Sequence, residues 1–238
     1  PFPGVPGPDN PDAFTGGAYN GPPGPELDRF VFSPVHYALV LYSTLIEVGR
    51  LGEDALSMFN VDGSTVELIG AEHSPGHEVT AGSLAQAASQ AAGIAHARKL
   101  RGDRGRVWLF LSDGEFQEGQ TWETVAAASW YRLGNLGAYV DVNGQQCDGA
   151  MDAVMNIEPL AARLEAFGAC VREVDGHDVE ALAGAADDPP EDRPLFVLAR
   201  TDPCRGVDLL RSRAPKLHYV RFKGDGERAE YERALRAM

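Results

Sequence analysis

Cysteine, long hydrophobic runs and basic residues are all scarce in this sequence. Its 238 residues include only three cysteines, Cys147, Cys170 and Cys204, which stand far apart without a CxxC spacing. This excludes a disulfide framework and a cysteine zinc site, and it favours a reducing, cytoplasmic compartment. No run approaches the ~20 apolar residues that span a bilayer, and no charged-then-apolar leader precedes a cleavage site. We therefore expect neither a membrane protein nor an exported precursor.

Basic residues are outnumbered, with 21 lysines and arginines against 35 aspartates and glutamates, and the formal net charge is −14. Such a surface repels phosphate backbones and anionic lipids, so we expect no nucleic-acid partner and no membrane partner. Core-forming material is in ample supply, because hydrophobic residues make up 44% of the sequence. The length suits one large domain or two small ones.

The first 25 residues differ in composition from the rest, with eight prolines and six glycines. We predict an extended or irregular arm over residues 1–25, without a regular helix, that is either disordered or laid over a partner. Residues 26–238 have a globular composition and are predicted to form the main domain. Within that domain, residues 187–192 (DDPPED) are expected to be a surface turn.

Short apolar runs predict buried strands, and longer amphipathic stretches predict helices between them. The strands are expected at 107–111, 136–140, 169–174 and 195–199. Helical patterns cover 34–50 and 119–132, and the alanine-rich stretch 82–101 can pack closely against a neighbour. In the first helix, the apolar side is expected to hold Val35, Ala38, Leu39, Tyr42, Leu45 and Ile46. This alternation predicts an α/β fold, with a parallel sheet and helices on both faces.

Polar residues follow two of the predicted strands directly. Asp113 and Gly114 come after the first strand, and Asn143 and Gly144 come after the second. Because neighbouring parallel strands end at the same edge of a sheet, we expect Asp113 and Asn143 to lie close together, where open α/β sheets bind ligands. Their oxygens suit Mg²⁺ or Ca²⁺. The alternative is that both pairs are only turn residues.

Several motifs in order resemble the thiamine-diphosphate-binding domain of transketolases. The sequence has SDGEFQEGQ at 112–120, WE at 122–123, LGNL at 133–136 and DVNG at 141–144. It also has DRFVFS at 28–33 followed by His36, TAGSL at 80–84 and VDGHD at 174–178. The resemblance covers about residues 26–205 and corresponds to the N-terminal, diphosphate-binding domain of the family.

The resemblance implies a set of cofactor and metal ligands. Asp113, the side-chain oxygen of Asn143 and the backbone carbonyl of Gln145 would bind Mg²⁺ or Ca²⁺, and the Gly114 backbone would donate to the diphosphate. His36 and His218 would reach the diphosphate and are candidate catalytic residues. The remaining implied cofactor-binding residues are Gly82, Ser83, Leu84, Ser112 and Glu115. Glu118 would lie at a subunit contact, while His177 is expected to shape a turn.

Three departures from the family pattern stand out. Ser112 replaces the first glycine of the family's GDG, and its Cβ would clash if the backbone φ angle were positive. The family's Gly-His-Pro segment, whose histidine assists proton transfer, has no clean counterpart; within residues 70–77 (GAEHSPGH), either His73 or His77 could serve. The family's early Ser-Gly-His-Pro-Gly-Gly segment is not recognisable in the arm.

The resemblance implies a transferase that moves a two-carbon ketol unit from a ketose phosphate to an aldose. It further implies dependence on a partner subunit that carries the pyrimidine-binding domain, for which we expect an α₂β₂ assembly. One alternative is the E1 α subunit of a 2-oxoacid dehydrogenase, although Asn143-Gly144 and the WE and LGNL motifs favour transketolase. Another is a non-catalytic, regulatory subunit, suggested by Ser112 and the altered histidine segment.

Overall fold

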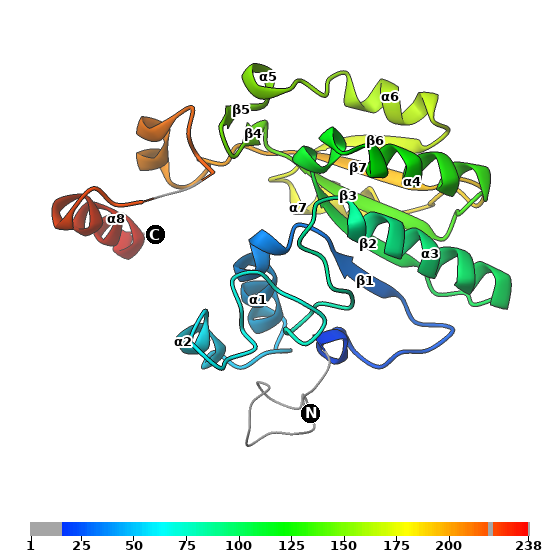
Figure 1. Cartoon of the computed structure of the whole chain (residues 1–238), viewed down its shortest axis with the longest axis horizontal. Coiled ribbons are helices and arrows are strands. Elements are labelled where there is room, and N and C mark those ends of the chain that lie inside the picture. The colour runs from blue at the N-terminus through cyan, green and yellow to red at the C-terminus, as the bar shows by residue number, and fades with distance from the viewer. Residues whose placement is uncertain (1–15, 219–220, 238) are drawn as a thin grey trace.

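The computed structural model describes residues 16–218 and 221–237, and its centre is a five-stranded parallel sheet (Figure 1). The strands are β1 (Arg29–Phe32), β2 (Val107–Ser112), β3 (Leu136–Val142), β6 (Cys170–Asp175) and β7 (Leu195–Arg200), and they lie in the order β1-β2-β3-β7-β6. A separate hairpin pairs β4 (Gln145–Gln146) with β5 (Gly149–Ala150). The predicted α/β fold and its four apolar strands are confirmed, whereas the edge strand β1 was not predicted.

Helices cover both faces of this sheet. The longer helices that do so are α1 (Ala38–Glu47), α3 (Gln86–Arg101), α4 (Gly119–Trp130), α6 (Leu160–Ala166) and α7 (Val179–Gly184), whereas α8 (Asp225–Ala237) lies apart from the sheet (Figure 1). The short ones are α2 (Ala55–Met58), α5 (Met151–Val154) and the 3-10 helices η1 (Gly16–Asn20), η2 (Val35–Tyr37), η3 (Asp113–Gln117) and η4 (Asp208–Arg213). Among the described residues, no helix is both long and apolar enough to cross a membrane.

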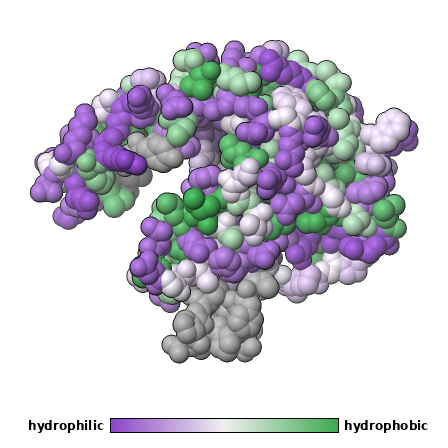
Figure 2. Space-filling view, in the orientation of Figure 1, coloured by the Kyte–Doolittle hydropathy of each residue, from purple (hydrophilic) through white to green (hydrophobic). Residues whose placement is uncertain are grey.

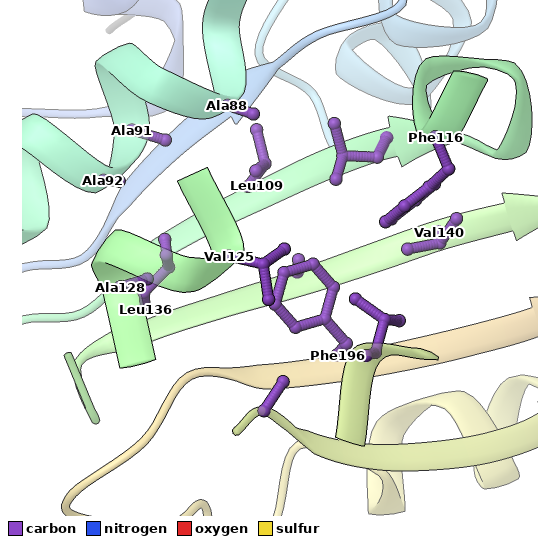
Figure 3. Packing of buried hydrophobic residues seen from close by; sticks show 14 of the residues in the cluster. Ala88, Ala91, Ala92, Leu109, Phe116, Val125, Ala128, Leu136, Val140 and Phe196 are labelled. Atoms are coloured by element: carbon purple, nitrogen blue, oxygen red, sulfur yellow. The ribbon is translucent and has the colours of Figure 1, made fainter. Parts of the chain in front are cut away.

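The main core lies between the sheet and helices α3, α4 and α6. Leu109 and Leu111 of β2 join it, while Phe110 packs with α1 on the opposite face, because successive strand residues point to opposite sides. The alanines of α3 let that helix approach the strands and α4 closely (Figure 3). The predicted close packing of the alanine-rich stretch is therefore confirmed for α3, which begins at Gln86 rather than at residue 82.

The predicted helix at 34–50 is shorter than expected. It begins with the 3-10 helix η2 and continues as α1. Most of its predicted apolar face is confirmed, since Val35, Ala38, Tyr42 and Leu45 are buried and Ile46 packs against the cluster that holds Tyr42 and Leu45. Leu39 is 44% exposed and Leu41 is buried instead, so the predicted face is wrong at this one position. Hydrophobic surface is visible over α1 (Figure 2).

The N-terminal arm is described from Gly16 onward. Residues 16–20 form η1, and Tyr19 within it is fully buried, so the prediction of an arm without helix is wrong for these five residues. Residues 1–15 lie outside the described residues. The chain at 187–192 forms no helix or strand and is mostly exposed, which confirms the predicted surface turn.

Candidate functional site

Asp113 and Asn143 meet at the carboxyl edge of the sheet, as predicted. Strands β2 and β3 are parallel neighbours in which Ser112 pairs with Asp141, so the residues that follow them emerge side by side. The backbone N–H of Gly144 donates to Asp113 Oδ2 at 2.8 Å. Gly144 has a φ angle of +66°, a left-handed conformation that favours glycine.

A cavity of about 230 Å³ opens beside this pair, and we call it the rim cavity. It is lined by Pro34, His36, Tyr37, Leu84, Ser112, Asp113, Gly114, Gln145, Gln146, Cys147 and His218. These residues come from five segments that are distant in the sequence. The structure therefore gathers seven of the predicted site residues around one space.

Asp113 is the charged group of the rim cavity, and its residue is only 2% exposed. Burial raises the pKa of its carboxyl to about 6, while the hydrogen bond from Gly144 acts in the opposite direction and the charge of Asp141 adds to the rise. No lysine or arginine of the described chain forms an ion pair with it. A bound cation would offset the free-energy cost of burying this carboxylate without a counter-charge.

The amide of Asn143 is held in one orientation. Its Nδ2 donates to Asp141 Oδ2 at 2.8 Å, and the Thr201 hydroxyl donates to the other oxygen of Asp141 at 2.5 Å. This leaves Asn143 Oδ1 as the acceptor, and it receives the backbone N–H of Gln145 at 2.8 Å. Within the described residues, the buried Oε1 of Gln145 has no hydrogen-bond partner.

Ser112 lines the rim cavity as the resemblance implies, whereas Glu115 does not. The φ angle of Ser112 is −100°, an ordinary extended value, so its Cβ causes no strain. Glu115 is fully buried and is not among the residues that line the rim cavity. Burial raises the pKa of its carboxyl, and hydrogen bonds from Ser33, Ser112 and Ala85 oppose that rise.

His36 and His218 both line the rim cavity. Burial and the neighbouring charge of His36 lower the pKa of His218. Leu84 lines the cavity as well, whereas Gly82 and Ser83 are exposed residues that precede it. The structure thus brings together the two predicted diphosphate-binding histidines at the edge that holds Asp113.

His73 and His77 are not part of the rim cavity as the described residues form it. His73 is exposed, and its Nε2 lies 2.9 Å from Glu67 Oε2. His77 is fully buried, with edge-to-face contacts to Phe32 and Tyr42. Burial lowers the pKa of His77 to about 4. A proton-transfer role for either histidine stays a prediction.

Sequence reasoning missed Tyr37. Its hydroxyl accepts a hydrogen bond from Asn143 Nδ2 at 3.4 Å. Tyr37 lines both the rim cavity and a larger apolar cavity of about 740 Å³ on the sheet face opposite to α3 and α4. Burial raises the pKa of Tyr37, so its hydroxyl stays protonated. The only available signal was its position directly after His36.

Two other predicted roles differ in outcome. His177 lies in a turn, where its Nε2 accepts the backbone N–H of Asp202 at 2.8 Å, so the prediction that it shapes a turn is confirmed. Glu118 is exposed at the start of α4, and its role at a subunit contact stays a prediction.

Comparison with known proteins identifies the family. The model of the transketolase thiamine diphosphate binding domain matches residues 19–208. The chain is 39% identical to the transketolase family protein y4mO of Sinorhizobium fredii, over 89% of this chain and 75% of that protein. It is 32% identical to an apulose-4-phosphate transketolase subunit from Actinobacillus succinogenes, over 90% of this chain and 76% of that protein.

Solved structures agree with this result. Transketolase from Pichia stipitis, in complex with sedoheptulose-7-phosphate, superposes with a TM-score of 0.68 at 32% identity. That superposition covers 73% of this chain but only 28% of the Pichia chain, so the present chain corresponds to one part of a full-length transketolase. The chain belongs to the transketolase family and carries that family's thiamine diphosphate binding domain.

Proposed function

We propose that this chain is the diphosphate-binding subunit of a split transketolase, in which it acts with a partner subunit that carries the pyrimidine-binding domain. The reaction would transfer a two-carbon ketol unit from a ketose phosphate to an aldose. The observation that carries the proposal is the rim cavity, where Asp113, His36 and His218 converge at the strand ends. The Actinobacillus relative is itself named as one subunit of an enzyme, and the match covers 90% of this chain and 76% of that subunit.

Asp113 and Gln145, which line the rim cavity, and Asn143, which lies outside its lining, fit a divalent cation of the Mg²⁺ or Ca²⁺ type. Asp113 would supply a carboxylate oxygen, Asn143 an amide oxygen and Gln145 a backbone carbonyl oxygen, which are the hard ligands that these ions prefer. Within the described part of the chain, no group of three or more histidine, cysteine, aspartate or glutamate side chains could hold a metal ion. The proposed ligand set is of a different kind, because it consists of one carboxylate and two neutral oxygens, one from an amide side chain and one from a backbone carbonyl.

Thiamine diphosphate, when bound, supplies the carbanion chemistry that ketol transfer requires. The chain's own contribution would be to hold the diphosphate with His36 and His218, and to place the Gly114 backbone against it. A Cβ on residue 114 would lie 3.2 Å from Gln146 Nε2, so any larger residue there would require the Gln146 side chain to move. Three free thiols are consistent with the reducing, cytoplasmic compartment that we propose.

One observation favours a second candidate, a non-catalytic subunit that keeps the fold. Neither His73 nor His77 lines the rim cavity of the described structure. If no histidine from this segment reaches the substrate, the chain would bind the cofactor without assisting proton transfer. Ketol transfer by the assembled complex would exclude this candidate.

The test of the metal site is Asp113→Ala in the complex of the chain with its partner subunit. Because this removes the only charged ligand that we propose, thiamine diphosphate should bind at least tenfold more weakly and lose its dependence on Mg²⁺. Isothermal titration calorimetry with and without Mg²⁺ measures both effects. Asp62→Ala, at an exposed residue outside the rim, is the control and should bind as the wild type does. Unchanged Mg²⁺ dependence in Asp113→Ala would show that the site assignment is wrong.

A further inference from the structure

Glu115 lies behind the rim cavity and accepts hydrogen bonds from three separate segments of the chain. Its Oε1 receives the Ser33 hydroxyl and, at 3.1 Å, the backbone N–H of Ala85. Its Oε2 receives the backbone N–H of Ser112 at 2.9 Å and the hydroxyl of the same serine at 3.3 Å. The carboxylate is fully buried, so these four donors take the place of water.

Each of the three segments leads directly to a residue that lines the rim cavity. Ser33 follows β1, and His36 is three residues further on. Ala85 comes immediately after Leu84, and Ser112 immediately precedes Asp113. A change in the position of any donor would therefore move a wall of the cavity.

The geometry requires two acceptor oxygens on one side chain. Each oxygen of Glu115 receives one backbone N–H, and a backbone N–H cannot reverse its direction as a hydroxyl can. A glutamine would turn its NH₂ group toward one of these two donors and leave that donor unsatisfied. Ala85 also has a φ angle of +70°, which is strained for a residue other than glycine and persists only where neighbouring contacts hold it.

We propose that Glu115 is a positioning residue. It fixes the relative positions of the three segments that lead into the rim cavity, so that the cavity can bind the diphosphate of the cofactor. Its carboxylate acts through Ser33, Ala85 and Ser112 and does not itself contact the ligand. The identity of that ligand rests on the proposed function, whereas the coupling of the three segments rests on the hydrogen bonds alone.

The first measurement needs no cofactor. Amide hydrogen exchange of the full chain, resolved at residues 85 and 112, should be at least tenfold faster at one of these two amides in Glu115→Gln. Two controls separate local from global effects. Glu165→Gln changes an exposed glutamate of α6, and Leu164→Ala removes a buried core side chain of the same helix. The proposal would be overturned if Glu115→Gln left the exchange rates of the amides at residues 85 and 112 unchanged.

The second measurement follows thiamine diphosphate binding with Mg²⁺ by the complex of the chain and its partner subunit. Glu115→Gln should bind at least tenfold more weakly, whereas Leu164→Ala, although it lowers the melting temperature, should keep the wild-type affinity. Equal losses of affinity in the two variants, or none in Glu115→Gln, would overturn the positioning role. If the wild-type complex binds no thiamine diphosphate, the proposed function fails, and the exchange result alone decides whether Glu115 couples the segments.

Discussion

Ser112 shows how a departure from a family pattern can be accommodated by backbone geometry. Its extended φ angle has room for a side chain, and its backbone N–H makes the shorter of its two bonds to Glu115. We therefore expect Ser112→Gly to change thiamine diphosphate affinity of the assembled complex by no more than a few-fold, as measured by calorimetry. A tenfold loss, about 1.4 kcal/mol, would give the hydroxyl a role that this geometry does not explain.

His77 predicts a pH dependence of stability. Burial lowers its pKa to about 4, so the folded state keeps the ring neutral while the unfolded chain binds a proton below pH 6.5. The contribution of this residue to stability is complete above pH 6.5 and is lost as the pH falls toward 4, amounting to about 3 kcal/mol. Urea unfolding of the wild type and of His77→Leu, compared between pH 4 and 7, should show a smaller pH slope for the variant. If the free energy of unfolding changed with pH equally in the wild type and the variant, His77 would not be the source of this pH dependence.

At the scale of single residues, sequence reasoning predicted that Asp113 and Asn143 lie together but did not predict the residues that support the site. Asp113 and Asn143 each follow a strand, so their meeting could be inferred from strand order alone. The supporting role of Glu115 could not, because its donors at Ser33 and Ala85 are 82 and 30 residues away in the sequence. Contacts of this kind exist only after the segments have folded together.

Helix α3 shows how small side chains set the spacing between elements. Ala91 is fully buried in the core that α3 shares with the sheet and α4 (Figure 3). Leucine at this position would overfill a packed interior, so we expect Ala91→Leu to lower the free energy of unfolding by about 1–3 kcal/mol. The matched control is Ala97→Leu on the exposed side of the same helix, where the change should stay within about 0.5 kcal/mol. Urea unfolding of both variants provides the comparison, and equal losses would contradict this account.

The elements that could be predicted were those with a strong local signal. Strands β2, β3 and β7 are mostly apolar runs of six or seven residues, and β6, which also holds charged residues, still has the valines Val171 and Val174. The edge strand β1 has only four residues and pairs with β2 alone, so tertiary pairing rather than its sequence pattern defines it. The apolar face of α1 was also predicted apart from Leu39, whereas the 3-10 turn η2 that precedes α1 was not, because a single 3-10 turn leaves no distinct periodic signal.

At the scale of the whole molecule, we propose that the chain supplies the diphosphate-binding half of a cofactor site. The rim cavity gathers groups suited to a diphosphate and a cation. Under the proposed function, the pyrimidine end of a cofactor held here would be bound by the partner subunit. The site would then lie at an interface, and two such pairs related by two-fold symmetry would form an α₂β₂ assembly.

This arrangement predicts that the chain is inactive by itself. Purified alone, it should show no ketol transfer from a ketose phosphate to an aldose, because the groups that hold the pyrimidine ring would come from the partner. Mixing it with the pyrimidine-domain subunit should restore activity, and Asp113→Ala mixed in the same way should not. Size-exclusion chromatography with light scattering should show the two chains in equal numbers. Robust turnover by the isolated chain, free of contaminating host enzyme, would overturn the split-enzyme proposal, since the catalytic groups would then all have to lie within these 238 residues.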